Sequence, residues 1–426
     1  MITKRALTRT LTPLAAFAFI VSACTSGATP SAATSAAPSA ASAAPSDAAS
    51  EAPSADPLAE LVTAAQAEGT LTTIALPHDW CNYGEAIETF KSKYEMEVNE
   101  LDPNAGSGDE IEAIKANKDN PGPQAPDVID VGLSFGPSAK AEDLLAQYMV
   151  QTWDTIPDDA KDPEGYWWGD YYGVLAFEVN TAVVSNVPQD WPDLLKPEYK
   201  GQVALAGDPR VSNQAIQAVY AAGLANGGSL DDASAGLAFF KELNAAGNLL
   251  PGIANAATVA AGETPITIRW TYNALANRDT TAASGGPAIE VVVPASGRFA
   301  GVYVQGISAF APHPNAARLW MEYLFSDEAQ LAWLAGHCHP IRIADLRRRG
   351  TIPLEKFDGA QPLDPDDYQD VDPVFPTLKE QERARDIITN GWDAVVGVEI
   401  RCVPQEDEQI PMSFNDTTTC EAPVLQ

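Results

Sequence analysis

At two places in the sequence, aromatic side chains stand beside carboxylates. Asp79 directly precedes Trp80, and Asp170 lies between Trp168 and Tyr171. Ring faces attract ammonium groups, and carboxylates pair strongly with such groups where water is excluded. The two groupings therefore favour a site for a polyamine-like organic cation. The alternative for Trp168 is that it fills the core, and the sequence supports both roles equally.

A third grouping has the opposite preference. Arg210, Ser212 and Asn213 stand at the predicted start of a helix, where a guanidinium and backbone N–H groups suit an anion. Arg210 could instead form a salt bridge with Asp208, two residues earlier in the chain. The two interpretations are equally supported, so an anionic solute stays open beside the cationic one.

The sequence offers little for catalysis or for a bound metal. His337, Cys338 and His339 are adjacent, but no second cluster supplies the further ligands that a zinc site needs. The sequence contains no nucleophile-elbow, zinc-protease or phosphate-loop motif. We therefore expect no metal, no cofactor and no enzymatic activity.

Apolar strands alternate with amphipathic helices along the folded part, and these elements must position the polar groups. Predicted strands cover 71–76, 96–101, 127–132, 202–206, 264–270 and 289–293, and predicted helices cover 58–67, 85–94, 109–118, 213–224, 234–244, 315–325 and 328–334. This alternation predicts an α/β fold of βαβ units, in which each lobe has a mostly parallel sheet flanked by helices.

Ligands of open α/β sheets bind beyond the carboxyl ends of the strands, where turns and helix N-termini face a crevice. The candidate ligand contacts are therefore side chains that follow predicted strands, precede a predicted crossing between lobes, or lie on the returning segment. They are Asp79, Trp80, Ser134, Phe135, Trp168, Tyr171, Asp208, Arg210, Ser212, Trp270, Tyr272 and Tyr303.

The composition restricts the class of protein. The chain has 426 residues, 45% of them hydrophobic, and a formal charge of −32. Such a length is too great for one ordinary core and favours two lobes. The negative charge argues against a nucleic-acid partner, because phosphates require a basic surface. The same charge suits a cationic ligand, but it also keeps an exposed protein soluble.

The N-terminus has the pattern of a secretory signal. Three basic residues precede an apolar run, 11–23, that is too short to span a bilayer. The run ends in Val-Ser-Ala-Cys24, which resembles the bacterial lipobox, so we expect residues 1–23 to be removed and Cys24 to be lipidated. Residues 24–56 are rich in Ala, Ser and Pro and predict an extended, disordered tether.

Four further cysteines are present, namely Cys81, Cys338, Cys402 and Cys420. An even number in an oxidising compartment predicts two disulfides, for which three pairings exist. We favour Cys402 with Cys420, which would staple the C-terminal tail, and hence Cys81 with Cys338 near the candidate cleft. The alternative is a set of free, buried thiols.

Four segments carry a resemblance to a known family. They are Asp127–Val131, Tyr172–Asn180, Trp191–Gly201 and Pro314–Gln330. In content and order they resemble the two-lobed, periplasmic-type (type II) solute-binding proteins of ABC importers. Within these proteins the chain is most similar to the group that handles polyamines, iron(III) and similar small solutes.

The resemblance also implies a division into domains. The expected first lobe comprises 57–178 and 300–400, the second lobe comprises 179–299, and 401–426 is a C-terminal extension without a counterpart. Iron(III)-binding relatives use paired tyrosines in the second lobe. Tyr171 and Tyr172 lie too early in the chain for that pair, which disfavours iron.

These observations predict a lipid-anchored, extracytoplasmic receptor on the bacterial cell membrane that captures a small solute between its lobes. The resemblance implies that it delivers the solute to an ABC permease and ATPase. We expect a monomer that contacts the membrane through its anchor only. An anion such as a phosphonate, ferric iron, a sensor role, and an extracytoplasmic enzyme on the same frame are the alternatives.

Overall fold

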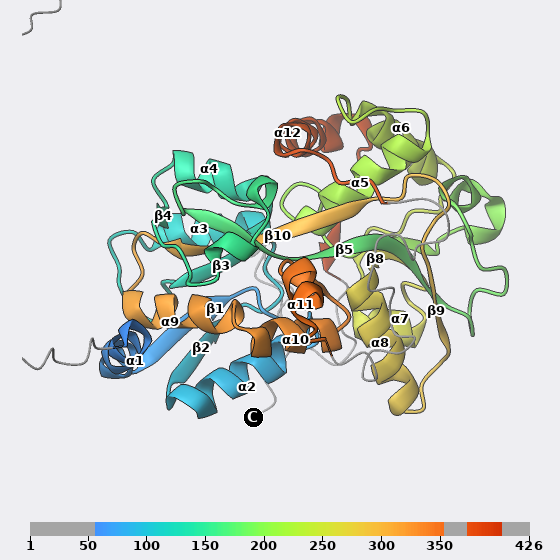
Figure 1. The fold of residues 1–426 in the computed structure, drawn as a ribbon. Helices are drawn as coiled ribbons and strands as arrows, with labels where there is room; N and C mark the ends of the chain where they lie inside the picture. Colours follow the sequence, from blue (N-terminus) through green and yellow to red (C-terminus); the bar gives the residue numbers. More distant parts are fainter. Residues whose placement is uncertain (1–55, 353–372, 403–426) are drawn as a thin grey trace, which may run out of the picture. The chain divides into compact units, whose positions relative to one another are not determined.

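The computed structural model describes residues 56–352 and 373–402 (Figure 1). Its α-helices are α1 (Pro57–Glu68), α2 (Tyr83–Tyr94), α3 (Ser107–Ala116), α4 (Phe135–Ala141), α5 (Asn213–Ala225), α6 (Ser234–Ala245), α7 (Ala256–Ala261), α8 (Thr271–Ala283), α9 (Pro314–Leu324), α10 (Asp327–Ala335), α11 (Ile343–Arg349) and α12 (Leu378–Val395). Its strands are β1 (Thr70–Ile74), β2 (Glu97–Leu101), β3 (Val128–Gly132), β4 (Leu145–Ala146), β5 (Trp167–Asn180), β6 (Val203–Leu205), β7 (Gly252–Ile253), β8 (Ile266–Trp270), β9 (Ile289–Val292), β10 (Ala300–Ser308), β11 (His339–Pro340) and β12 (Arg401–Cys402).

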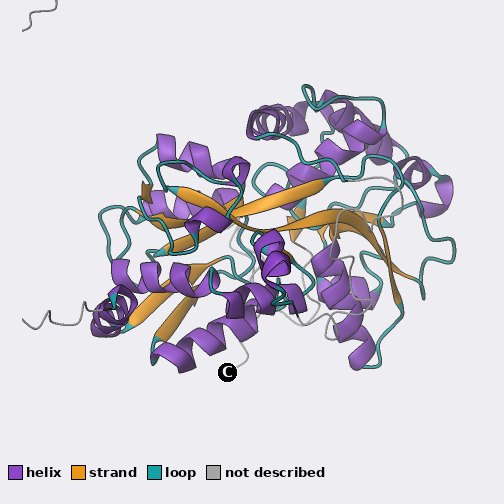
Figure 2. Cartoon of the chain, in the orientation of Figure 1, coloured by secondary structure: helices purple, strands orange, loops and turns teal. Residues whose placement is uncertain are grey.

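Two long strands cross between the lobes. β5 pairs with β10 from Trp167 to Val174 and with β8 and β9 over the rest of its length, from Leu175 to Asn180. β10 also pairs with β3, so the strand order is β3-β10-β5-β8-β6. Helices surround the strands in both lobes (Figure 2). All residues of β5 are buried. The first lobe is built around β3 with the separate pair β1–β2, and the second lobe around β8 and β6.

The two-lobed α/β fold predicted from the sequence is confirmed, but the strand directions are more mixed than the alternation indicates. β1 with β2 and β6 with β8 are parallel pairs. β10 is antiparallel to both β3 and β5. The physical reason is that β5 leaves the first lobe and β10 returns to it, so the two crossing strands run in opposite directions.

Helix α8 was not predicted. The sequence placed Tyr272 at the end of a strand, whereas it lies in the first turn of α8. The buried face of this helix includes polar side chains, Asn273, Asn277 and Thr281, so the apolar periodicity that reveals a helix is weak. Asn277 Nδ2 donates to the carboxylate of Glu178 on β5, which satisfies one of these buried groups.

The C-terminal helix α12 packs against α5 and α6, which belong to the expected second lobe. Trp392 lies against Phe240 with ring centroids 5.7 Å apart, and Gln217 Nε2 donates to Gln381 Oε1 at 3.3 Å. β12 extends β7 in parallel. The expected boundaries assigned residues 300–400 to the first lobe, whereas α12, which lies within this range, packs on helices of the expected second lobe. We therefore propose that the returning segment of the first lobe ends before α12.

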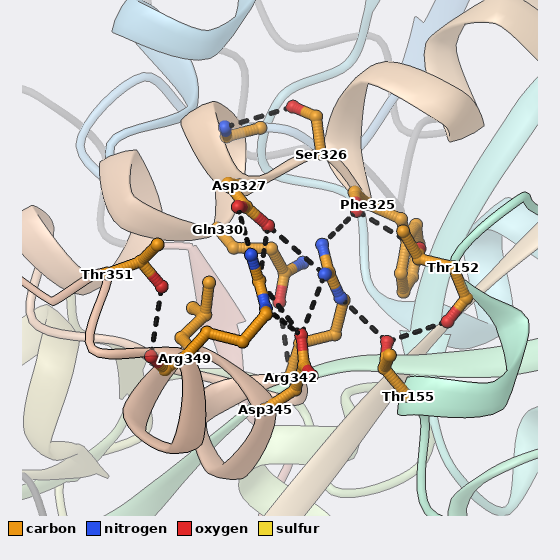
Figure 3. Close-up of polar contacts among 12 residues, drawn as sticks. Thr152, Thr155, Phe325, Ser326, Asp327, Gln330, Arg342, Asp345, Arg349 and Thr351 are labelled. Carbon is orange, nitrogen blue, oxygen red and sulfur yellow. Dashed lines mark hydrogen bonds and ion pairs between the residues drawn. The ribbon is translucent and has the colours of Figure 1, made fainter.

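A buried ionic cluster joins α10 to α11 (Figure 3). Arg342 is 3% exposed and donates to Asp327 and Asp345, both at 3.1 Å, and to Thr155 Oγ1 at 2.8 Å. Arg349 donates to the same two carboxylates at 2.7 and 2.9 Å. Each carboxylate in this cluster, which we call the arginine clamp, thus has guanidinium partners. The clamp fixes α11, and with it the preceding β11, which pairs with β5.

Within the described ranges, no helix is both long and apolar enough to cross a membrane. Several predictions concern residues outside the described ranges. These are the signal peptide, the lipidated Cys24, the tether before residue 56, residues 403–426 of the C-terminal extension, and the disulfide between Cys402 and Cys420.

Candidate ligand-binding site at the lobe junction

Five aromatic side chains meet where the crossing strands pass between the lobes, and we call them the aromatic seam. They are Trp80 from the turn after β1, Tyr171 from β5, Tyr303 from β10, Trp270 from the end of β8 and Tyr272 from α8. Neighbouring ring centroids are 5.5 to 6.4 Å apart. Trp80 is partly buried and the other four are fully buried. All five were candidate ligand contacts in the sequence, and the fold brings them together.

Hydrogen bonds connect the seam to the first lobe. Trp80 Nε1 donates to Tyr171 Oη at 2.8 Å, and Tyr171 Oη donates to Asp130 Oδ2 at 2.6 Å. Trp270 Nε1 lies 3.4 Å from Tyr303 Oη, to which it donates. A partly buried ring is therefore linked through one hydroxyl to a buried carboxylate on β3.

Two glycines allow the rings of the second lobe to lie directly on the crossing strands. A Cβ atom at Gly173 of β5 would stand 2.4 Å from the ring of Tyr272. At Gly301 of β10 it would stand 2.3 Å from the ring of Trp270. Contacts this short do not occur, so any larger residue at either position would displace a ring of the seam.

The turn that carries Trp80 is constrained on its C-terminal side. Cys81 and Asn82 adopt φ values of +48° and +64°, a region that side-chain-bearing residues rarely occupy. Cys81 forms a disulfide with Cys338, which lies between α10 and β11, and their Cα atoms are 5.3 Å apart. The disulfide therefore ties the turn that holds Trp80 to the segment that the arginine clamp fixes.

Two carboxyl groups lie beneath the seam, Asp130 on β3 and Asp170 on β5, and we call them the acid pair. Asp130 Oδ2 accepts hydrogen bonds from Tyr171 Oη and, at 2.8 Å, from Tyr83 Oη. Asp170 accepts from the Tyr171 backbone N–H at 2.6 Å and from Gln305 Nε2 at 2.7 Å. Asp130 is 5% exposed and Asp170 is fully buried. Every side chain bonded to the pair is uncharged in its ordinary state.

Burial controls the protonation of the acid pair, because a charged carboxylate loses its hydration there. Burial raises the pKa of Asp130 to about 6, against the opposing hydrogen bonds from Tyr171 and Tyr83. Burial, and then the negative charge of Asp130, raises the pKa of Asp170 well above its usual range. The pair therefore retains a proton at a pH where an exposed aspartate has lost it.

A third buried carboxyl group stands behind the pair. Glu110 of α3 is 1% exposed and accepts a hydrogen bond from the Asp130 backbone N–H at 2.9 Å. Burial, and then the charge of Asp130, raises the pKa of Glu110 well above its usual range. Among the described residues no Lys, Arg or His forms an ion pair with Asp130, Asp170 or Glu110.

Polar atoms without protein partners lie at the edge of the junction. Asn213, the first residue of α5, packs so closely on Gly132 that a Cβ atom there would lie 2.0 Å from its amide carbon. Asn213 Nδ2, the Ser134 hydroxyl and the Tyr272 hydroxyl are buried and have no hydrogen-bond partner. Buried polar groups in folded proteins are nearly always bonded, so such atoms mark a place for a ligand or water.

The lobes are in contact on both sides of the crossing strands. On one side Arg385 of α12 donates to the Ser134 carbonyl at 2.7 Å and lies over the ring of Phe135. On the other side His337 Nε2 pairs with Asp279 Oδ2 of α8 at 3.0 Å. α12 and α8 lie on opposite sides of β5 and β10 in Figure 1. Phe135 thus contacts Arg385 of α12.

The remaining sequence candidates lie apart from the seam. Trp168 packs between Trp153 and Phe325 inside the first lobe, in agreement with its core interpretation. Asp79 is exposed. Arg210 forms a salt bridge with Asp208 at 2.6 Å, which was the alternative raised from the sequence, and a longer salt bridge with Asp393. Ser212 precedes α5, but its side chain does not cap the helix.

Sequence reasoning did not select Asp130, Glu110, Tyr83 and Gln305. Asp130 carried a usable signal, since it is the one charged residue within the buried strand β3, between Ile129 and Val131. The other three carried none, because the contacts that bring them to the acid pair join residues far apart in the chain.

Comparison with known proteins identifies the family. Residues 124–346, just over half of the chain, match the family described as bacterial extracellular solute-binding protein. The chain belongs to this family. A curated relative of this solute-binding protein, from Haemophilus influenzae and named only as an uncharacterized protein, is 30% identical over 266 residues, covering 58% of the chain and 71% of the relative.

Solved structures with the same fold bind several kinds of solute. The periplasmic binding protein AfuA of Actinobacillus pleuropneumoniae, with fructose 6-phosphate bound, is 23% identical and covers 77% of this chain and 98% of its own, with a TM-score of 0.59. Iron-bound HitA of Pseudomonas aeruginosa is 18% identical, covers 77% and 99%, and has a TM-score of 0.57. A putative spermidine/putrescine ABC transporter protein of Listeria monocytogenes is 15% identical, covers 76% and 99%, and has a TM-score of 0.55. At these identities the likeness establishes the fold alone.

The family assignment confirms the coarser part of the predicted function. This protein is an extracellular solute-binding component. Such components of ABC importers work with a permease and an ATPase. Its family and its structural neighbours are binding proteins rather than enzymes.

Proposed function

We propose that this solute-binding protein captures a small organic cation with ammonium groups, such as a polyamine, at the aromatic seam. The observation that supports this most directly is the burial of Asp130, Asp170 and Glu110 without a basic partner among the described residues. Buried charges in stable proteins are paired. An ammonium group would supply the missing positive charge, and the partly buried Trp80 would offer it a ring face.

An anionic solute receives weaker support. Arg210, the basic group predicted near a helix start, is already paired with Asp208. Asn213 Nδ2 and the Ser134 hydroxyl could donate to an anion, but the buried carboxyls nearby offer it no positive charge, and any that ionised would repel it. A sugar phosphate or phosphonate is therefore the second candidate.

Ferric iron receives less support still. Tyrosine binds iron(III) as tyrosinate, and burial raises the pKa of both Tyr171 and Tyr272 well above the usual tyrosine range. Their hydroxyls thus keep their protons more strongly than exposed ones. We also propose that the protein is held at the outer face of the membrane through a lipid on Cys24, as the lipobox-like sequence indicates.

A thermal-shift and calorimetric comparison tests the proposed solute class. Putrescine and spermidine should raise the melting temperature, because a ligand that binds only the folded state stabilises it by mass action, by about 2.7 kcal/mol at a hundredfold excess over Kd. Fructose 6-phosphate, methylphosphonate and ferric citrate should not. A shift with a phosphate or phosphonate and none with either polyamine would replace the cationic proposal by the anionic one.

The anchor needs a separate experiment. The intact chain, expressed in a bacterium that processes lipoproteins, should partition into the membrane fraction, and the Cys24→Ala variant should be released from it. Equal membrane association of the two proteins would show that Cys24 does not carry the anchor.

A further inference from the structure

The hydrogen bonds of the acid pair leave one oxygen without a donor. Asp130 Oδ2 and both oxygens of Asp170 accept hydrogen bonds from Tyr171, Tyr83 and Gln305. Asp130 Oδ1 is buried and has no hydrogen-bond partner. The two carboxyl groups belong to one hydrogen-bond network, because Gln305 Nε2 donates to Asp170 Oδ2 and to Tyr83 Oη, and Tyr83 Oη donates to Asp130 Oδ2. A proton on Asp130 Oδ1 would make this atom a donor, whereas two ionised carboxylates have only acceptors.

Among residues 56–352 and 373–402, no basic side chain forms an ion pair with Asp130 or Asp170. The titratable side chains that face the pair come from every surrounding helix and strand, and they are Tyr83 (α2), Glu110 (α3), Tyr171 (β5), Tyr272 (α8) and Tyr303 (β10). Two further groups lie near the seam. Arg269 is engaged with Glu178 at 2.9 Å, and His339 of β11 stacks on Tyr172. Two buried carboxylates without a counter-charge are costly to ionise together, which favours one proton held by the pair.

A second unpartnered atom lies near the pair. The Tyr272 hydroxyl is fully buried and has no hydrogen-bond partner, and its ring centroid is 5.7 Å from that of Tyr171. The charges of Asp130 and Asp170 act on this hydroxyl, after burial and the neighbouring Tyr303. An ammonium group has three donors. It could satisfy Asp130 Oδ1 and the Tyr272 hydroxyl together, whereas a proton satisfies only the first.

We propose that the acid pair holds one proton in the solute-free protein and exchanges it for an ammonium group of the solute. This inference rests on the proposed function, since it requires a cationic solute. The exchange balances, because one proton leaves the pair for the solvent and one ammonium group arrives with all of its own protons. The pair thereby determines specificity. A neutral solute has no charge that could replace the proton, and an anionic solute would make the loss of the proton from the pair less favourable.

Calorimetry with putrescine measures the exchange directly. Titrations in two buffers of different ionisation enthalpy give the number of protons released per solute bound, and at a pH where the free pair still holds its proton we expect a value approaching one. Over the range where the free pair is protonated, Kd should tighten by up to about tenfold for each pH unit. Tight binding of putrescine without proton release and without this pH dependence would overturn the exchange and leave the proposed function standing.

The Asp170→Asn variant gives the matched control. Its amide cannot ionise, so the variant has a single carboxyl group at the pair and no second negative charge that favours a shared, exchangeable proton. Putrescine should bind this variant more weakly, and the number of protons released should fall toward zero. Proton release equal to that of the unaltered protein would overturn the assignment to the pair.

A measurement without solute keeps the inference testable if no polyamine binds. A carboxyl whose pKa is raised by folding stabilises the folded state at low pH, and this stabilisation is lost as the pH rises through the folded-state value. As the pH rises from the unfolded-state pKa of an aspartate toward the raised folded-state value, the folding equilibrium constant of the unaltered protein should fall relative to that of Asp170→Asn, by up to about tenfold per pH unit. Parallel pH profiles would show that the pair holds no proton, whatever the solute.

Discussion

The arginine clamp and the acid pair are polar clusters of the first lobe that each contain buried carboxylates, yet they differ in how their charges are balanced. In the clamp, Asp327 is bonded to two guanidinium groups and the buried Asp345 to three (Figure 3). In the acid pair, Asp130 and Asp170 are bonded only to hydroxyl, amide and backbone donors.

This difference separates a structural cluster from a candidate binding site. A cluster with balanced charges gains little from a further ion, and removing one partner leaves a buried charge uncompensated. A buried cluster of negative charges carries an uncompensated desolvation cost until a proton or a cation neutralises it. The clamp should therefore matter for folding, and the acid pair for binding.

The largest effect should come from the clamp. Replacing Arg342 by alanine leaves Asp345 buried without its innermost partner and should lower the free energy of unfolding by about 3–5 kcal/mol. Arg348→Ala is the control, because Arg348 also bonds Asp345 but is exposed, so its loss should cost at most about 1 kcal/mol. Chemical denaturation measures both. Equal losses would show that the burial of Arg342 has no special role.

The next effect should come from the acid pair and should appear in binding. Asp130→Asn removes one carboxylate with little change of shape, and hydrogen bonds to charged groups contribute about 1.5–3 kcal/mol. Putrescine affinity should therefore fall by roughly 10- to 150-fold, with the melting temperature preserved or raised. Asp154→Asn, at an exposed position of the same lobe, should change neither quantity. An unaltered Kd in Asp130→Asn would remove this carboxylate from the site.

A smaller effect should come from the seam. Trp80→Ala removes the partly buried ring that bonds Tyr171, and cation–π contacts contribute about 0.5–2 kcal/mol. The affinity for putrescine should thus fall by roughly 2- to 30-fold. Trp153→Ala provides the comparison, because Trp153 is also partly buried but packs on Trp168, away from the seam. If both variants bound putrescine equally well, Trp80 would be a packing residue only.

The smallest effect concerns pH, where the two clusters should respond with opposite signs. The hydrogen bond from Arg349 lowers the pKa of Asp327. Burial would raise the pKa of Asp345, but the hydrogen bonds and charges of Arg349 and Arg342 outweigh it and lower that pKa. A lowered pKa contributes stability above the unfolded-state value, about 3.9, that is lost as the pH falls through the folded-state value.

The free energy of unfolding of the unaltered protein, measured by denaturation, should therefore fall between about pH 5 and 3. In the Arg349→Gln variant this fall should be smaller, by at most about 1 kcal/mol, because Arg349 is 38% exposed. The acid pair should show the reverse dependence, with stability lost as the pH rises through about 6. An identical acid response in the variant would contradict the role of Arg349.

The sequence predicted the fold well because local patterns decide it. Strand β8 and helix α5 follow from apolar runs and periodicity, and their observed bounds differ from the predicted ones by one or two residues. The sequence pattern indicates the long crossing strand β5 and helix α8 less clearly. β5 is buried throughout and so shows no alternation, and α8 buries Asn273 and Asn277.

The candidate site could be predicted only in part. The rule that ligands bind beyond strand ends selected Trp80, Trp270 and Tyr272, which the fold does bring together. The same rule selected Arg210, whose partner is its near neighbour Asp208. It missed Asp130, whose significance comes from the pairing of β3, β10 and β5 rather than from its position in the sequence.

The central claim is that buried, unpaired carboxylates select a cationic solute. Isothermal titration of the purified protein with putrescine, beside fructose 6-phosphate, tests it most directly. The account predicts one putrescine bound per chain with the heat abolished or strongly reduced in Asp130→Asn, and no binding of the sugar phosphate. If the protein bound fructose 6-phosphate and did not bind putrescine, the central claim would be contradicted.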